Sequence, residues 1–195
     1  MNVLFLGRRD SPILSYLRGR HTDVGWSAER LPNDPAFYTY DWYVSHGYRY
    51  IITPEQLEGR RFVNCHISYL PWNRGASPNA WSWYDDSPKG VTLHFMDAGV
   101  DTGPIITLRK VAFGKGETLA TSYARLQAEM FSLFCEKWQG IIDGEIRPFT
   151  SSFAGTYHYT AETERIITPL LTDGWATPVS VLVDAGRKAR DKGNP

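Results

Sequence analysis

Short apolar runs alternate with segments of helical periodicity along most of this chain, and that alternation is typical of α/β folds. The first run, Val3–Leu6, ends at Gly7, and Ser11 with Pro12 then opens an amphipathic helix. Three further runs have the length of buried strands, at residues 42–44, 62–67 and 90–96. These runs are apolar on both faces, which favours a mainly parallel twisted sheet with helices on both faces.

Two more helices are predicted beyond the first. Thr53-Pro54-Glu55 is a helix start, and apolar residues from Glu117 to Trp138 recur with the spacing of one helix face. Residues 31–39 contain two prolines and no period, so we expect a loop there. At 195 residues the chain is long enough for one well-cored domain.

The charges of the chain balance, with 21 Lys plus Arg against 21 Asp plus Glu. Because its net charge is zero, such a chain has no broad electrostatic field that would attract nucleic acid or an anionic membrane. The apolar run at the N-terminus is too short for a signal peptide, and nowhere do about 18 apolar residues follow one another. We therefore expect a cytoplasmic protein. Cys65 and Cys135 have no metal-site spacing and are expected to be buried small hydrophobic residues.

Polar residues stand where two of the predicted strands end. Asn64 and His66 share one side of the run at 62–67, because successive side chains of a strand alternate. Asp101 lies in a turn after the run at 90–96, so the three polar groups can converge on one cleft. Each also has a structural alternative: a satisfied core histidine, an asparagine that caps a loop, and an aspartate that makes a turn. For His94, on the neighbouring strand, the packed or hydrogen-bonded core alternative is favoured.

The motifs Asn-x-His at 64–66, Ser-x-Leu-Pro at 68–71 and Asp-Thr-Gly at 101–103, in this order, resemble those of the formyltransferases that use 10-formyltetrahydrofolate. The likeness is closest from residue 41 to residue 111. It implies a Rossmann-like formyltransferase fold, with the catalytic domain at residues 1–150. Residues 151–195 are expected to form a short C-terminal extension that packs on this domain and has a frayed, charged end.

Transfer of a formyl group to an amine makes three demands on a site. The incoming nitrogen loses a proton, the carbonyl oxygen becomes an oxyanion, and the leaving nitrogen gains a proton. The resemblance implies that Asn64, His66 and Asp101 are the catalytic residues. Asn64 can donate to the oxyanion, and His66 can donate to the same oxygen or protonate the leaving nitrogen. Asp101 can orient His66 and relay protons through a water. A hydrolase that uses Ser68 is the alternative, and the absence of a G-x-S-x-G motif disfavours it.

The resemblance also implies the co-substrate, 10-formyltetrahydrofolate, and no metal. In the family the pterin enters a slot that is held mainly by main-chain groups. The matching cofactor-binding positions here are Tyr50, Ile51 and Ile52 on one side of the slot, and Asp97 and Val100 on the other. A dinucleotide is disfavoured, because the turn after the first strand lacks G-x-G-x-x-G.

The loop Pro-Trp-Asn-Arg-Gly at 71–75 is similar to that of two kinds of relative, the sugar-nucleotide N-formyltransferases and the formylation domains of nonribosomal peptide synthetases. This resemblance implies that Pro71, Trp72 and Arg74 bind the substrate. Arg74 either anchors a phosphate or is a solvated arginine in a loop. Trp81 and Trp83 either stack on a base or sugar or, as is favoured, serve as core aromatics.

The acceptor that this likeness favours is a small-molecule amine, the amino group of a nucleotide-linked amino sugar. The expected partners include no nucleic acid and no membrane, and a homodimer is compatible with the family. Alternatives are a carrier-bound aminoacyl group of nonribosomal peptide synthesis, glycinamide ribonucleotide, and a catalytically dead module that binds folate or a nucleotide.

Overall fold

The computed structural model describes residues 1–193, and the chain divides into two compact units. Unit 1 comprises Met1–His66, Thr92–Thr107 and Met130–Thr150. Unit 2 comprises Ile67–Val91, Leu108–Glu129 and the described residues from Ser151 onward. The predicted boundary at residue 150 coincides with the end of unit 1, but unit 2 also takes two earlier segments. The predicted division into a catalytic domain and an extension stays a prediction.

A six-stranded sheet has the order β2-β1-β3-β4-β6-β7. Its strands are β1 Asn2–Gly7, β2 Asp23–Ser27, β3 Trp42–His46, β4 Phe62–His66, β6 Gly90–Phe95 and β7 Ile105–Lys110. The pairs β1/β2, β1/β3 and β3/β4 are parallel, so the predicted mainly parallel sheet is confirmed. The pair β4/β6 is antiparallel, and it sets Asn64 opposite His94 and His66 opposite Thr92.

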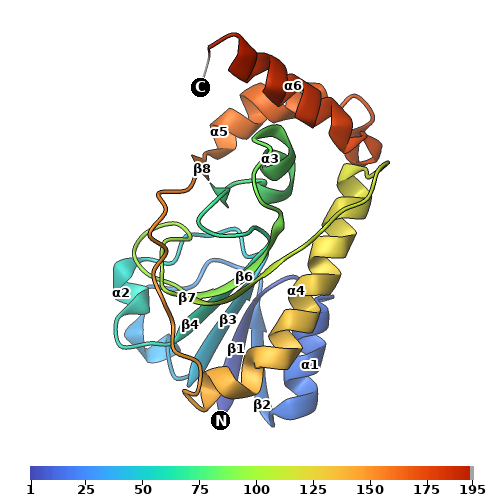
Figure 1. The fold of residues 1–195 in the computed structure, drawn as a ribbon. Helices are drawn as coiled ribbons and strands as arrows, with labels where there is room; N and C mark the ends of the chain where they lie inside the picture. The colour runs from blue at the N-terminus through green and yellow to red at the C-terminus, as the bar shows by residue number, and fades with distance from the viewer. Residues whose placement is uncertain (194–195) are drawn as a thin grey trace. The chain divides into compact units, whose positions relative to one another are not determined.

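Helices cover both faces of the sheet in unit 1. Helix α1, Pro12–Arg20, and the C-terminal half of α4, Leu119–Ile142, lie side by side on one face (Figure 1), with the Tyr16 and Phe134 ring centres 6.0 Å apart. On the other face Tyr43 stacks on Phe62 at 4.3 Å, in a cluster against which Leu57 of helix α2, Pro54–Leu57, packs. The two apolar faces of the strands are therefore both buried, as their sequence predicts.

The helix starts follow the predicted capping residues. The Ser11 hydroxyl accepts the Ile13 N–H before α1, and Thr53 with Gln56 forms a capping box before α2. Three elements were not predicted: strand β2, strand β7, and a short 3₁₀ turn, η1 Pro35–Phe37, inside the expected loop. Helix α4 also continues to Ile142, past Trp138, the last residue of the predicted helix face.

Unit 2 is mainly helical, and its core contains six buried apolar residues: Ala80, Trp81, Leu119, Ile167, Val179 and Leu182. Its elements are strands β5 Arg74–Gly75 and β8 Tyr157–His158, helices α3 Pro78–Tyr84, α5 Thr160–Glu162 and α6 Val179–Asp191, and the turns η2 Thr163–Ile167, η3 Thr168–Leu170 and η4 Gly174–Ala176, with the N-terminal half of α4. Helices α3 and α6 touch closely, because a Cβ on Gly186 would lie 1.8 Å from the Tyr84 carbonyl oxygen. The charged run expected to fray is helical as far as Asp191, and its last two residues lie outside the described part of the chain.

The two cysteines differ in burial. Cys65 is buried as predicted, and burial raises the pKa of its thiol, which keeps it protonated and unreactive. Cys135 is only half-buried, so the prediction was wrong for this residue. Within residues 1–193, every helix is too short or too polar to span a lipid bilayer.

His21 gives unit 1 a pH-dependent contact. The Trp138 indole N–H donates to His21 Nε2 at 2.8 Å, and burial, with the N-terminal amine and Arg20, lowers the pKa of His21. Because protonation removes this acceptor, the unfolded chain binds the proton more readily, and stability should fall as pH drops below about 6.5. Urea unfolding at pH 8 and pH 5.5 should show the decrease. In His21→Gln, the decrease in the free energy of unfolding between pH 8 and pH 5.5 should be smaller than in the wild type, by less than about 1 kcal/mol. The same decrease in both proteins would contradict this role for His21.

Candidate active site

Four polar side chains of unit 1 meet at the C-terminal end of β4. Asn64 and His66 lie on one face of that strand, His94 stands opposite Asn64 on β6, and Asp101 returns to them on the loop between β6 and β7. The three residues singled out in the sequence are therefore brought together, with His94 added to them. The His66 and Asp101 side chains are only 8% and 10% exposed, so their interactions are little screened by water.

Asp101 connects the members of this cluster. Its Oδ1 accepts the Asn64 Nδ2–H at 3.0 Å, and its Oδ2 lies 3.5 Å from His66 Nδ1. His94 Nε2 lies 3.5 Å from Asp101 Oδ1. Two imidazole rings and an amide thus surround one carboxylate, an arrangement that can hold and move a proton.

His94 fixes the orientation of the Asn64 amide. Its Nδ1 lies 2.8 Å from the Phe95 carbonyl oxygen, which can only accept, so Nδ1 carries the proton. In the neutral ring Nε2 then accepts the second Asn64 N–H, at 3.2 Å. The His94 side chain is 2% exposed and hydrogen-bonded, as favoured from the sequence. Its link to Asn64 was not foreseen, because the pairing of β4 with β6 creates it.

The loop between β6 and β7 is shaped to present Asp101. Asp101 itself has φ 53°, in the left-handed region that aspartate tolerates better than most residues. The Asp97 Oδ1 accepts the Gly99 N–H at 3.0 Å and the Thr102 hydroxyl at 2.6 Å. A Cβ on Gly103 would lie 1.9 Å from the Phe95 carbonyl oxygen, so glycine is required there.

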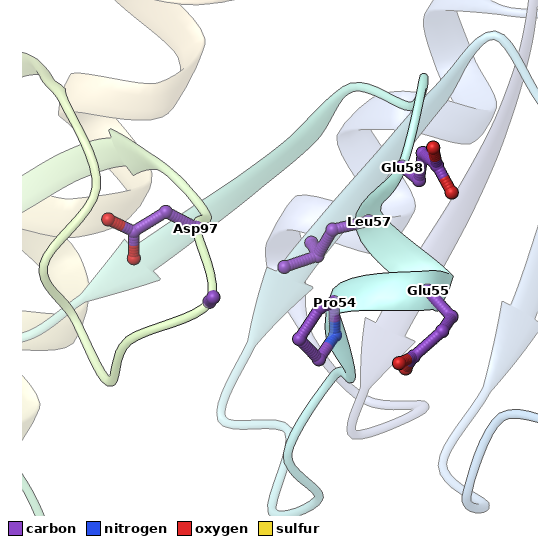
Figure 2. A pocket seen from close by; sticks show the side chains of 6 residues that line it. Pro54, Glu55, Leu57, Glu58 and Asp97 are labelled. Atoms are coloured by element: carbon purple, nitrogen blue, oxygen red, sulfur yellow. The ribbon is translucent and has the colours of Figure 1, made fainter.

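A groove of about 440 Å³ lies in unit 1 and is lined by six residues: Pro54, Glu55, Leu57, Glu58, Asp97 and Ala98. Figure 2 shows Pro54 and Leu57 facing the loop that carries Asp97, whose carboxylate points away from α2. The Asp97 carboxylate therefore does not point toward α2 across the groove. The volume of the groove falls in the range of small-molecule binding sites.

One of the five predicted cofactor residues, Asp97, is among the residues that line this groove. Tyr50, Ile51 and Ile52 precede Pro54, another of its lining residues, in the chain. Ile51 is 63% exposed and Ile52 only 4%, so the Ile52 side chain belongs to the core. Val100, half-buried, precedes Asp101 on the loop.

The predicted substrate-binding loop lies in unit 2. Main-chain contacts hold Trp72: its N–H donates to the Tyr69 carbonyl at 3.2 Å, and its carbonyl accepts the Ser68 hydroxyl at 2.8 Å. The Arg74 guanidinium donates to the carbonyl oxygens of Ala154 at 3.3 Å and Thr156 at 3.4 Å. Arg74 is thus a half-buried anchor of the segment after residue 150, not a solvated loop arginine.

A buried polar network under this loop was missed by the sequence reasoning. Asn73 is fully buried at φ 58°; its Nδ2 donates to Asp85 Oδ2 at 3.2 Å, and its Oδ1 accepts the Ser87 hydroxyl at 2.6 Å. His158 Nε2 lies 2.8 Å from the same Asp85 oxygen, and its ring stacks on Trp81 with the centres 3.7 Å apart. Trp81 is therefore a core aromatic, as favoured. His158 stood in no motif that would have indicated this contact.

Comparisons with known proteins agree on one family. A model of the formyl transferase family matches residues 28–137. The solved formyltransferase PseJ from Anoxybacillus kamchatkensis, in complex with UDP-4,6-dideoxy-4-formamido-L-AltNAc and tetrahydrofolate, is 40% identical, and the match covers 95% of this chain and 100% of that one with a TM-score of 0.88.

Two curated relatives match over shorter segments. The dTDP-4-amino-4,6-dideoxyglucose formyltransferase of Mycobacterium bovis is 32% identical over 110 residues, 56% of this chain and 47% of its own length. The methionyl-tRNA formyltransferase of Myxococcus xanthus is 38% identical over 87 residues, 44% of this chain and 28% of its own length. The chain thus spans less than half the length of these two relatives.

Proposed function

Because the chain belongs to the formyl transferase family, we propose that it is an N-formyltransferase that moves a formyl group from 10-formyltetrahydrofolate to the amine of a nucleotide-linked amino sugar. The observation that carries the proposal is the convergence of Asn64, His66 and Asp101 on one buried cluster. The acceptor class is supported by the likeness to PseJ, because that match extends over nearly the whole chain.

The proposed chemistry assigns one task to each residue of the cluster. When bound, 10-formyltetrahydrofolate supplies the formyl carbon, attached to its N10. Asp101 receives the proton that the incoming amine loses, directly or through a water, while the new N–C bond forms and the C–N10 bond breaks. Asn64 donates to the developing oxyanion, and His66 delivers a proton to the leaving nitrogen. No covalent enzyme intermediate is needed.

The present contacts of Asn64 set a condition on this scheme. Both amide protons are engaged, one by Asp101 and one by His94. To reach an oxyanion, Asn64 must exchange one of these partners, and the Asp101 contact is the natural one to give up. Once Asp101 has gained a proton it is a weaker acceptor, so proton uptake by Asp101 and donation by Asn64 favour each other.

The groove in unit 1 suits the flat pterin of the co-substrate. The predicted residues Tyr50, Ile51, Ile52, Asp97 and Val100 would hold it, mainly through their main chain. Two observations support this: the Asp97 carboxylate is engaged within its own loop, and Ile51 exposes an apolar surface that a ring can cover. Glu55 and Glu58 line the same groove, so an anionic portion of the co-substrate is expected to point away from them.

The proposal is tested by following tetrahydrofolate release in an absorbance assay. The acceptors are UDP- and dTDP-linked amino sugars, glycinamide ribonucleotide and an aminoacyl group on a carrier protein. Release that depends on one amino-sugar nucleotide is the expected result. Folate binding without release from any acceptor would favour the dead binding module instead, and release with another acceptor would reassign the substrate. Light scattering on the same sample determines whether the protein is a monomer or a homodimer.

A further inference from the structure

Unit 2 exposes an aromatic ring next to a stacked pair of aromatic rings. Phe153 is 66% exposed, and its ring centre lies 5.7 Å from that of Trp72. Trp72 in turn stacks on Tyr69, at 6.3 Å and an interplanar angle of 29°. We call Tyr69, Trp72 and Phe153 the aromatic platform. An exposed aromatic ring next to other aromatic rings offers an apolar surface on which a flat ligand can stack.

The backbone beneath Phe153 is held in place. Gly155 has φ 68°, and a Cβ there would lie 2.0 Å from the Pro71 carbonyl oxygen, so the two segments touch at the backbone. The same carbonyl accepts the Thr156 N–H at 3.2 Å, and the Arg74 N–H donates to the Thr156 carbonyl at 3.0 Å. A ring on so restrained a segment loses little conformational entropy when a ligand covers it.

A cation lies next to the platform. Arg74 donates to the carbonyl of Ala154, the residue after Phe153, and to that of Thr156. These contacts use two of the five N–H donors of a guanidinium, which suits the remainder to phosphate oxygens. An exposed aromatic ring beside an arginine is a combination that can bind a nucleotide, because the base stacks on the ring and the phosphates pair with the cation.

The tryptophans that the sequence offered for base stacking are engaged elsewhere. Trp81 is buried and stacks on His158. Trp83 packs against Phe113, with the ring centres 5.2 Å apart, and Lys89 Nζ lies 4.6 Å from the centre of its ring. Phe153, in contrast, exposes its ring.

We propose that the aromatic platform stacks the pyrimidine base of the nucleotide-linked substrate and that Arg74 binds its diphosphate. The identity of the nucleotide rests on the proposed function: the similar PseJ is in complex with a UDP-linked sugar, and the Mycobacterium bovis relative is named for a dTDP-linked one. Uracil and thymine present the same aromatic face, so stacking on Phe153 accepts either base.

The test is calorimetric titration of the folate-free protein with UDP, dTDP and inorganic pyrophosphate. Phe153→Ala should weaken UDP and dTDP binding by about tenfold or more, since a stacked base commonly contributes that much. It should leave pyrophosphate binding unchanged, because pyrophosphate has no base. Phe153→Tyr should retain the wild-type affinity within about threefold, since the ring survives. Phe149→Ala is the matched control, because Phe149 is also exposed, at 49%, but lies outside the platform.

The outcomes separate this inference from the proposed function. Equal UDP affinity of the wild type and Phe153→Ala, or no binding of either nucleotide by the wild type, overturns the platform. If formyl transfer is seen and Phe153→Ala raises the KM for the amino-sugar nucleotide with kcat kept, both stand. If the wild type binds UDP through Phe153 but formylates no amino sugar, the platform stands and the proposed function fails.

Discussion

Replacing Asp101 with asparagine is expected to lower kcat by about 100-fold or more, because general-base assistance commonly contributes that much. Asparagine keeps the shape of the side chain and tolerates the left-handed backbone at this position. Its amide oxygen can still accept the Asn64 N–H, so the loop should stay in place. What it loses is the ability to take a proton from the amine and to balance positive charge on His66.

Asp86→Asn is the matched control for this variant. Asp86 also has a left-handed backbone, at φ 54°, but its side chain is 68% exposed and pairs with Lys89, 3.5 Å away. The control should keep kcat within about twofold and stability within about 0.5 kcal/mol. Single-turnover rates and folate affinity are measured for both variants. Wild-type turnover in Asp101→Asn would remove Asp101 from the mechanism, and a loss of folate affinity alone would make it a cofactor residue.

Strand periodicity was sufficient to put Asn64 and His66 together. The alternation in β4 sets both on one face, and no tertiary knowledge is needed for that. Asp101 was suggested by its turn after the run at 90–96, and the family resemblance gave it a catalytic role. Its actual position depends on a loop that reverses direction through a left-handed residue. The antiparallel pairing of β4 with β6 leaves no mark on hydrophobic periodicity. The resulting contact of His94 with Asn64 therefore could not be predicted.

The missed elements lack the usual local signals. Strand β2 has an exposed or half-buried pattern at the edge of the sheet and contains Gly25, where a Cβ would lie 2.3 Å from the Tyr40 hydroxyl. Glycine is chosen there for tertiary packing, against strand propensity. Helix α3 starts after Ser77, which has φ 49° and makes no side-chain capping bond, so no capping motif announces it.

The polar network of unit 2 could not be predicted from the sequence, for a different reason. His158 and Asp85 are 73 positions apart, and neither stands in a pattern that indicates the other. Their pairing needs the segment after residue 150 to return to the loop at 71–75, where β5 and β8 form a two-stranded parallel sheet. Contacts of such long range are set by packing of the whole unit, so single-sequence periodicity does not report them.

Asn64→Ala is the second substitution with a large expected effect, a decrease in kcat of about 100- to 1,000-fold, because one oxyanion donor is typically worth that much. Asn79→Ala is its matched control. Asn79 is a buried asparagine that, like the half-buried Asn64, donates twice, to the Leu119 carbonyl at 3.2 Å and to the Ser122 hydroxyl at 3.1 Å. The control should lower the melting temperature by several degrees, because the Leu119 carbonyl and the Ser122 hydroxyl lose a hydrogen-bond donor. Its kcat should stay within a few-fold of the wild-type value.

The double variant Asn64→Ala with Asp101→Asn decides whether the two residues act as one unit. Because Asn64 donates to Asp101, and the proposed chemistry couples proton uptake by one to donation by the other, the losses should not add. We expect the double variant to be about as slow as the slower single variant. Losses that multiply fully would mean that Asn64 and Asp101 act independently. A single variant Asn64→Ala with wild-type kcat would leave the oxyanion to His66 alone.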